Sequence, residues 1–307
     1  MKFDQLDMTL LQAIADIKNL PQGALNIRRD GQAVLRQSSP NISITTNPEN
    51  GGLIVDIKAG TKNETVHVPV ILTQSGFKDK VYNKFIVGED ADVTIIAGCG
   101  IHNDSHADSS HDGIHEVIVK KGARMKYIEK HYGEGSGKGK RILNPTTIIR
   151  VESGATAEME MSQIKGVDDT LRSTVAYIKE KGNLKVVERL LTHDSQIAES
   201  DIEVHIEGGG GVAQILSRSV AQDNSTQVFK AALYGENECS GHVECDAIIM
   251  DGAKIRAVPQ LVAENAEAIL THEAAIGKIA GEQLIKLMSL GLSEQEAINT
   301  ILEGFLR

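Results

Sequence analysis

The feature that most constrains this fold is a repeat of short segments rich in Val and Ile, separated by glycine turns. Apolar and polar residues alternate in each segment, which is typical of strands with one buried face. The segments cover residues 52–57, 66–72, 92–96, 116–119, 125–128, 147–151, 184–187 and 202–206. Turn glycines Gly88, Gly122, Gly154, Gly182 and Gly211 lie 34, 32, 28 and 29 residues apart. Such a period predicts stacked units, each burying its apolar face against the next.

No amphipathic helical pattern lies between these segments, which disfavours a doubly wound α/β sheet. We therefore predict a mainly β fold whose core is a parallel β-helix. A two-sheet β-sandwich is the alternative that the same alternation allows.

Both ends of the chain have helical spacing instead. Near the N-terminus, apolar residues recur at helical intervals until Pro21 and Gly23. Near the C-terminus a similar pattern runs to Gly291, and Ser293 with Glu296 forms a capping box for a second helix. We predict an N-terminal helical segment at 1–24, a β-helix core at 25–262 and a C-terminal helical domain at 263–307. The C-terminal helices are too short to bury themselves, so they should cap the core or dock a partner.

Composition excludes several classes of partner. The net charge of −10 argues against nucleic acid, and the dispersed basic residues argue against a membrane surface. No apolar run approaches the roughly 18 residues that a membrane-spanning helix needs, and acids near the N-terminus argue against a signal peptide. Three cysteines with no CxxC spacing indicate a reducing, cytoplasmic location.

The cysteines fall in different contexts. Glycines flank Cys99, which allows either close backbone approach or a turn. Cys239 lies in a polar stretch and is predicted to be an exposed loop thiol. Cys245 lies in an alternating apolar run, where it is either a small buried hydrophobe or a ligand. His272 and Glu273 follow it, either as the start of a helix or as ligands, because thiolate, imidazole and carboxylate are all metal-binding groups.

Residues 101–115 form a histidine-rich segment containing His102, His106, His111 and His115. Interleaved Asp residues could orient the imidazoles around a metal. The spacing matches no standard zinc motif, so a polar loop explains it equally well. If the segment binds metal, the alternative function is a metal-dependent β-helix hydrolase or lyase.

The glycine-rich stretch at residues 133–141 resembles a phosphate-binding loop but lacks the Walker A order, because Arg141 follows Lys140. No GxSxG nucleophile elbow is present either. Nucleotide hydrolysis would have to come from another protein.

An ordered set of motifs in the C-terminal part resembles the SufB/SufD scaffold proteins of iron–sulfur cluster assembly. It consists of Cys245-Asp246-Ala247-Ile248-Ile249, then Pro259 and Leu261, then His272-Glu273-Ala274 and Glu282-Gln283-Leu284. Upstream, Gly98-Cys99 and His115-Glu116-Val117 continue the likeness, which spans roughly residues 60–307. His-Glu at 272–273 is SufB-like, whereas SufD has His-Gly. The long N-terminal extension of bacterial SufB has no counterpart here.

The resemblance implies a right-handed parallel β-helix and a non-enzymatic scaffold that carries a transient iron–sulfur cluster. It places cluster assembly at Cys245, His272 and Glu273, at a dimer interface. It also implies that Cys99 accepts sulfur from a donor protein and that Lys140 lies on the transfer path. The implied partners are a SufC-like ABC-type ATPase, docked on the C-terminal helices, and a second copy or SufD-like paralogue, docked on the β-helix.

Overall fold

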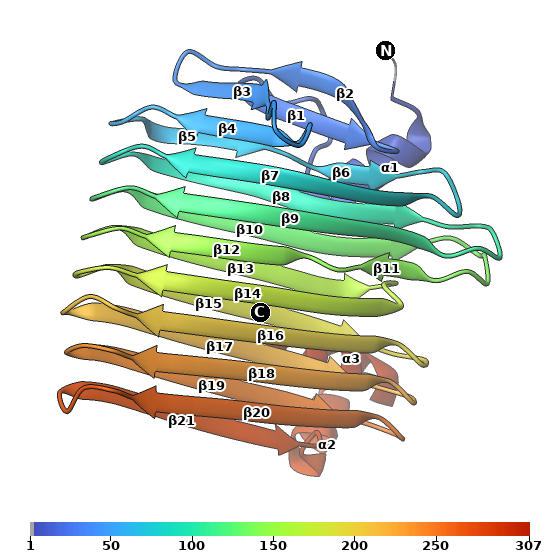
Figure 1. Ribbon diagram of the computed structural model, residues 1–307. Helices are drawn as coiled ribbons and strands as arrows, with labels where there is room; N and C mark the ends of the chain where they lie inside the picture. Colours follow the sequence, from blue (N-terminus) through green and yellow to red (C-terminus); the bar gives the residue numbers. More distant parts are fainter. Residues whose placement is uncertain (1–2) are drawn as a thin grey trace.

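The computed structural model describes residues 3–307, apart from the side chain of Ile164, and shows a parallel β-helix with helices at both ends (Figure 1). The first sheet contains β2 (Gln32–Gln37), β1 (Ala24–Arg29), β5 (Lys62–His67), β6 (Val70–Leu72), β8 (Asp92–His102), β10 (Arg124–Glu134), β13 (Thr156–Lys165), β15 (Asn183–Thr192), β17 (Gly211–Ala221), β19 (Cys239–Ile249) and β21 (Ala268–Gly277). The second sheet contains β3 (Ile42–Thr46), β4 (Leu53–Ile57), β7 (Lys78–Val87), β9 (Ser109–Val119), β11 (Arg141–Leu143), β12 (Thr146–Val151), β14 (Asp169–Ile178), β16 (Ile197–Ile206), β18 (Thr226–Gly235) and β20 (Lys254–Ala263).

Most coils contribute one strand to each sheet, and strands of successive coils pair in parallel; β5 with β6, and β11 with β12, are one coil's strand in two pieces. Arg124 of β10, for example, pairs with Asp92 one coil earlier and with Thr156 one coil later. The predicted β-helix is thereby confirmed, and the β-sandwich alternative is wrong because strands of successive coils pair in parallel, outside the two N-terminal hairpins.

The glycine period corresponds to one coil. Gly122 and Gly154 have φ near +68° and +67°, a conformation that glycine adopts without steric strain. Their N–H groups donate to the Ser153 and Glu180 carbonyls of the following turn. The turns therefore stack on one another as the strands do, and the repeat in the sequence follows from that stacking.

The two sheets enclose a packed interior, here called the lumen. Side chains alternate between buried and partly exposed along the strands. One continuous apolar cluster runs through the lumen from Ala24 to Cys245. Polar and charged side chains are also buried in it, and these define the candidate site below.

The two ends of the β-helix differ. Antiparallel hairpins β1–β2 and β3–β4 close the N-terminal end, and α1 (Gln5–Ala15) packs on the first sheet. The C-terminal end has no such cover within residues 3–307, and β21 is exposed on both faces from Thr271 to Gly277. Figure 1 shows α2 (Gly281–Ser289) and α3 (Glu294–Phe305) behind the last coils, rather than across this end.

The predicted start of helical structure at residue 263 was wrong, because β21 occupies residues 268–277 and the helices begin at Gly281. Ala268 to Gly277 pair in continuous register with β19, and this nonlocal pairing prevails over the local helical spacing. The helical spacing at both chain ends and the Ser293–Glu296 capping box are confirmed. Among residues 3–307, no helix combines the length and apolar character needed to cross a bilayer.

Candidate functional site

Cys99 lies on β8 with its thiol in the lumen, 7% exposed. Gly98 and Gly100 point outward, and a Cβ built on Gly98 would lie 2.5 Å from the Ile14 carbonyl oxygen of α1. The flanking glycines therefore admit the N-terminal helix rather than a ligand. Burial raises the pKa of the Cys99 thiol well above its usual value, and Glu129 and Asp79 raise it further.

Cys245 lies on β19 and also faces the lumen, 5% exposed. It pairs with Ser217 on one side and Ala274 on the other. Burial, followed by the charge of Glu188, raises its pKa to about 12. The thiol is therefore protonated near neutral pH, and a metal would have to displace that proton.

The structure brings together only part of the predicted cluster site. His272 pairs with lumen-facing Val243, so it belongs to the same face of the sheet as Cys245. Glu273 pairs with Glu244 and belongs to the opposite, outer face. Both residues are exposed at the open end of the β-helix. One chain thus presents Cys245 and His272 on one face and Glu273 on the other.

A line of buried polar side chains runs through the lumen between Cys99 and Cys245. This polar file consists of His131, Glu129, Gln163, Thr170, Arg172, Glu188, Ser200 and Ser217. Cys99 is the strand neighbour of His131 at one end, and Ser217 is the strand neighbour of Cys245 at the other. Polar side chains inside the core therefore join the two cysteines.

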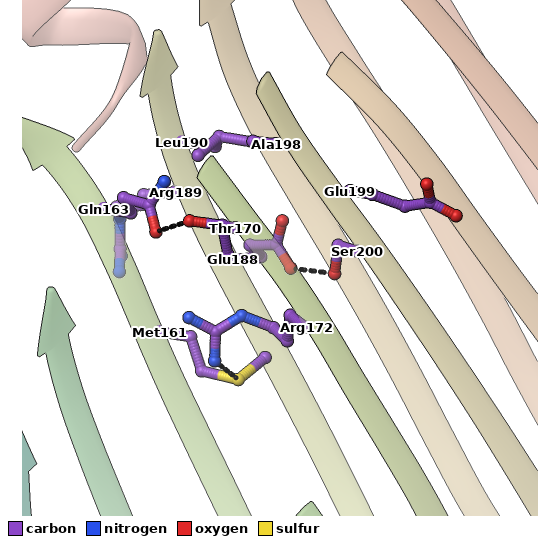
Figure 2. Close-up of a pocket in the computed structure, with 10 residues that line it drawn as sticks. All are labelled: Met161, Gln163, Thr170, Arg172, Glu188, Arg189, Leu190, Ala198, Glu199 and Ser200. Carbon is purple, nitrogen blue, oxygen red and sulfur yellow. Dashed lines mark hydrogen bonds between the residues drawn. The ribbon is translucent and has the colours of Figure 1, made fainter. Parts of the chain in front are cut away.

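Most side chains of the polar file have a hydrogen-bond or ion-pair partner within it. Arg172 donates to Glu129 at 2.9 Å, and His131 Nε2 lies 2.8 Å from the same carboxylate. Figure 2 shows the middle of the file, where Thr170 donates to Gln163 at 2.8 Å and Ser200 donates to Glu188 at 2.6 Å. These side chains surround a cavity of about 10 Å³, close to the volume that one water needs.

The pKa values of the two carboxyl groups in the polar file shift in opposite directions. Burial alone would raise the pKa of Glu129, but Arg172 and His131 hold it well below its usual range. Burial raises the pKa of Glu188, because its attraction to Arg172 does not compensate. Arg172 is therefore the positive centre of the lumen, with an ionised carboxylate on one side and a more readily protonated one on the other.

Lys140, which the resemblance placed on the transfer path, lies outside the lumen. Its side chain is 51% exposed and pairs with Asp169 at 2.6 Å. The basic residue inside is Arg172, which sequence reasoning missed. A signal existed, because Thr170, Arg172 and Thr174 alternate with the outward residues of β14, yet polar side chains at such positions suggest an exposed face.

The four histidines of residues 101–115 do not form one site. His102 ends β8 on the outer face, 2.8 Å from Asp104, and His106 is exposed in the following turn. His111 and His115 are buried in the lumen on β9. Burial lowers the pKa of His115 to about 4, so this ring is neutral near pH 7.

Two further groups bear on metal chemistry. Cys239 is buried at the start of β19, 6% exposed, so its prediction as an exposed loop thiol was wrong.

His193, Asp194 and Asp223 bring three ligand atoms within 4.8 Å of one another. They lie at surface turns, and Asp223 already accepts the Asp194 N–H at 2.8 Å.

Comparison with known proteins shows which family this chain resembles. Residues 74–305 match the family model described as SUF system FeS cluster assembly, SufBD core domain. A SufBD family protein of Archaeoglobus fulgidus is 28% identical over 89% of this chain and 73% of its own length. One from Methanocaldococcus jannaschii is 25% identical over 97% of each chain.

The iron–sulfur cluster assembly protein SufB of Bacillus subtilis is 25% identical over 84% of this chain. Some relatives are longer, since the chain spans 55% of this SufB and 63% of a Methanothermobacter thermautotrophicus relative. With most of its length matched to one family model, the chain belongs to the SufBD core family of SUF-system iron–sulfur cluster assembly proteins.

Proposed function

We propose that this chain is the scaffold subunit of a SUF-type complex, accepting sulfur at Cys99 and assembling a nascent iron–sulfur cluster at Cys245. The observation that carries the proposal is the polar file linking the two buried cysteines. The cluster is cargo, so the scaffold acts without catalysing a reaction of its own. Three free cysteines suit a reducing compartment such as the cytoplasm.

The cluster site is completed by a second subunit. Strands β20 and β21 end their sheets, and an unpaired strand edge is a template for pairing with another chain. A second copy or a SufD-like paralogue docked there would face Cys245 and His272 and add its own ligands. Glu273, on the outer face, would serve a cluster only after β21 adjusts or across such an interface. Carboxylate or imidazole ligation beside thiolate would leave the cluster labile enough to transfer.

The ATPase docks on the C-terminal helices. None of the nine residues of α2, all of them described, is buried. Ile285 is 68% exposed and Leu290 is 75% exposed, so an apolar surface is available to a partner. The partner would supply the nucleotide chemistry for which this chain has no Walker A sequence.

The separation of the two cysteines limits how sulfur could move. Five strand steps separate β8 from β19, or about 24 Å at the usual strand spacing. The thiols cannot exchange sulfur by direct contact over that distance. The Cys99 thiolate would attack the outer sulfur of a donor protein's persulfide, so that the donor S–S bond breaks, the donor thiol leaves and Cys99 carries the persulfide. A thiol reductant would then supply two electrons, becoming a disulfide, and would release the outer sulfur as sulfide, which would move along the file.

Anaerobic reconstitution with the ATPase present tests the proposal. Cys245→Ala should abolish the visible absorption of the cluster under every condition. Cys99→Ala should abolish it when a persulfide donor protein with a thiol reductant supplies sulfur, but not when inorganic sulfide is added. Cys239→Ala, a buried cysteine outside the file, is the matched control and should assemble normally. An unchanged spectrum in Cys245→Ala would refute the assignment.

A further inference from the structure

Two buried histidines of β9 converge on one point in the lumen. His111 and His115 are four residues apart, which separates their Cα atoms by about 13 Å along a strand. Gly113 lies between them, and a Cβ built there would be 3.2 Å from His111 Nε2 and 2.8 Å from His115 Nε2. The two rings therefore lean toward each other over the space that the glycine leaves.

Hydrogen bonds to the other ring nitrogen fix the tautomer of His111. Its Nδ1 lies 3.1 Å from Asp79 Oδ2, and a carboxylate only accepts, so Nδ1 carries the proton. Arg28 holds Asp79 in place with two hydrogen bonds, of 2.8 and 2.9 Å. In the neutral ring with its proton on Nδ1, the lone pair of His111 is on Nε2.

The tautomer of His115 follows in the same way. Tyr127 donates its hydroxyl proton to Glu129 at 3.0 Å, so it accepts from His115 Nδ1 at 2.9 Å. Stacking on Phe85, with ring centres 5.8 Å apart, fixes the ring plane of His115. Its Nε2 also presents a lone pair toward Gly113.

This arrangement leaves a polar atom without a partner in the core. His111 is 2% exposed, and its Nε2 has no hydrogen-bond partner among the described residues. Leaving a buried acceptor unpaired is unfavourable. Histidines that bind metals have this pattern, with the far N–H donated to a carboxylate or another fixed acceptor.

A thiol lies within the same region. Cys99 faces the lumen from the opposite sheet and belongs to the same buried cluster as Leu143, the strand neighbour of His111. The three donor atoms do not all lie within 4.8 Å of one another, so the donors already in place are the two imidazoles. Imidazole suits borderline divalent ions such as Fe²⁺, Co²⁺ and Zn²⁺. His102 and His106 lie outside the lumen and cannot contribute.

We propose that His111 and His115 bind a borderline divalent metal ion over Gly113. The site is separate from the proposed cluster site at Cys245 and does not depend on it. It lies at the end of the polar file where sulfur would be accepted, so Fe²⁺ held here would meet sulfur inside the protein.

Anaerobic titration of the full chain with Co²⁺ tests this site, because visible d–d absorption reports tetrahedral binding. We expect one equivalent in the wild type and at least about tenfold weaker binding in His111→Ala and His115→Ala. His102→Ala and His106→Ala, from the same segment, should bind as the wild type does. Cys99→Ser should retain the d–d absorption, because the two imidazoles hold the ion.

Gly113→Ala provides a test that removes no ligand. Its methyl group would occupy the point of convergence, so it should weaken Co²⁺ binding while the circular dichroism spectrum stays unchanged. Wild-type affinity in both histidine variants would overturn the proposal, as would loss of Co²⁺ binding in Cys245→Ala. The latter result would place the metal at the cluster site instead. Cluster assembly can fail in Cys245→Ala while cobalt binding persists, so the two proposals fail separately.

Discussion

At the scale of single residues, the unusual feature is a set of charges inside a β-helix core. Arg172 is 4% exposed and Glu129 is 2% exposed, and they form a direct ion pair. Removing charge from water is strongly unfavourable unless the partner groups compensate. Arg172 satisfies Glu129 and reduces the penalty of burying Glu188, so its loss would leave carboxylates without a counter-charge.

We therefore expect Arg172→Met to lower the free energy of unfolding by about 3–5 kcal/mol, because Glu129 is left as an unpaired buried charge. Urea unfolding followed by circular dichroism measures this change. The double variant Arg172→Met with Glu129→Gln should recover much of the loss. Lys126→Met breaks an outer-face pair with Glu160 and should change stability by at most about 1 kcal/mol. An Arg172→Met variant as stable as the wild type would show that the pair is dispensable.

At the scale of secondary-structure elements, α1 packs against β8, a strand that lies far from it in the sequence. Leu10 and Ile14 are fully buried where α1 lies against the first sheet. The close approach is possible because Gly98 and Gly100 have no side chains on the outer face. The sequence predicted both the helix and the strand, but not that they pack on each other, because 80 or more residues separate them.

The two glycines provide a matched pair of variants. A Cβ at Gly98 would lie 2.5 Å from the Ile14 carbonyl oxygen, whereas a Cβ at Gly100 would lie 3.4 Å from Ile14 and Leu10 side-chain atoms. Gly98→Ala should therefore displace α1 and destabilise the chain by about 1–3 kcal/mol, and Gly100→Ala should have a smaller effect. Hydrogen exchange should show faster exchange of α1 amides in Gly98→Ala. Equal exchange in the two variants would rule out this account of the contact.

At the scale of the whole molecule, the β-helix is closed at its N-terminal end and open at its C-terminal end. The apolar residues left exposed are concentrated in the last coil and in α2, including Ile269, Ile276, Ile285 and Leu290. The end of the chain turns back along the first sheet, where Arg189 donates to the Arg307 carbonyl oxygen. The helices are thus attached to the β-helix while much of their apolar surface stays exposed.

Charged substitutions on α2 and at Leu290, the residue that follows it, test the proposed docking of the ATPase. Ile285→Asp and Leu290→Asp should weaken binding of the ATPase, measured by isothermal titration calorimetry, by removing apolar contact area. Their thermal midpoints should stay near that of the wild type, because both side chains are exposed. Leu171→Asp, an equally drastic change at a residue 54% exposed on β14, should bind the ATPase normally. Undiminished binding in the Ile285 and Leu290 variants would move the docking surface elsewhere.

The sequence by itself determined the local and periodic properties of this protein. Alternation predicted the strands, glycine spacing predicted the coil, and helical spacing with a capping box predicted the terminal helices, because these signals act over a few residues or repeat with each coil. Ordered motifs pointed to the family. Only the tertiary structure decided which polar residues face inward, because alternation along a strand does not say which of its two faces is buried. Arg172 on β14 faces the lumen, whereas Lys140 lies outside it, just before β11. It likewise separated His111 and His115 from His102 and His106, and Glu273 from Cys245. Strand pairing between coils sets those faces, and that pairing joins residues about 30 positions apart.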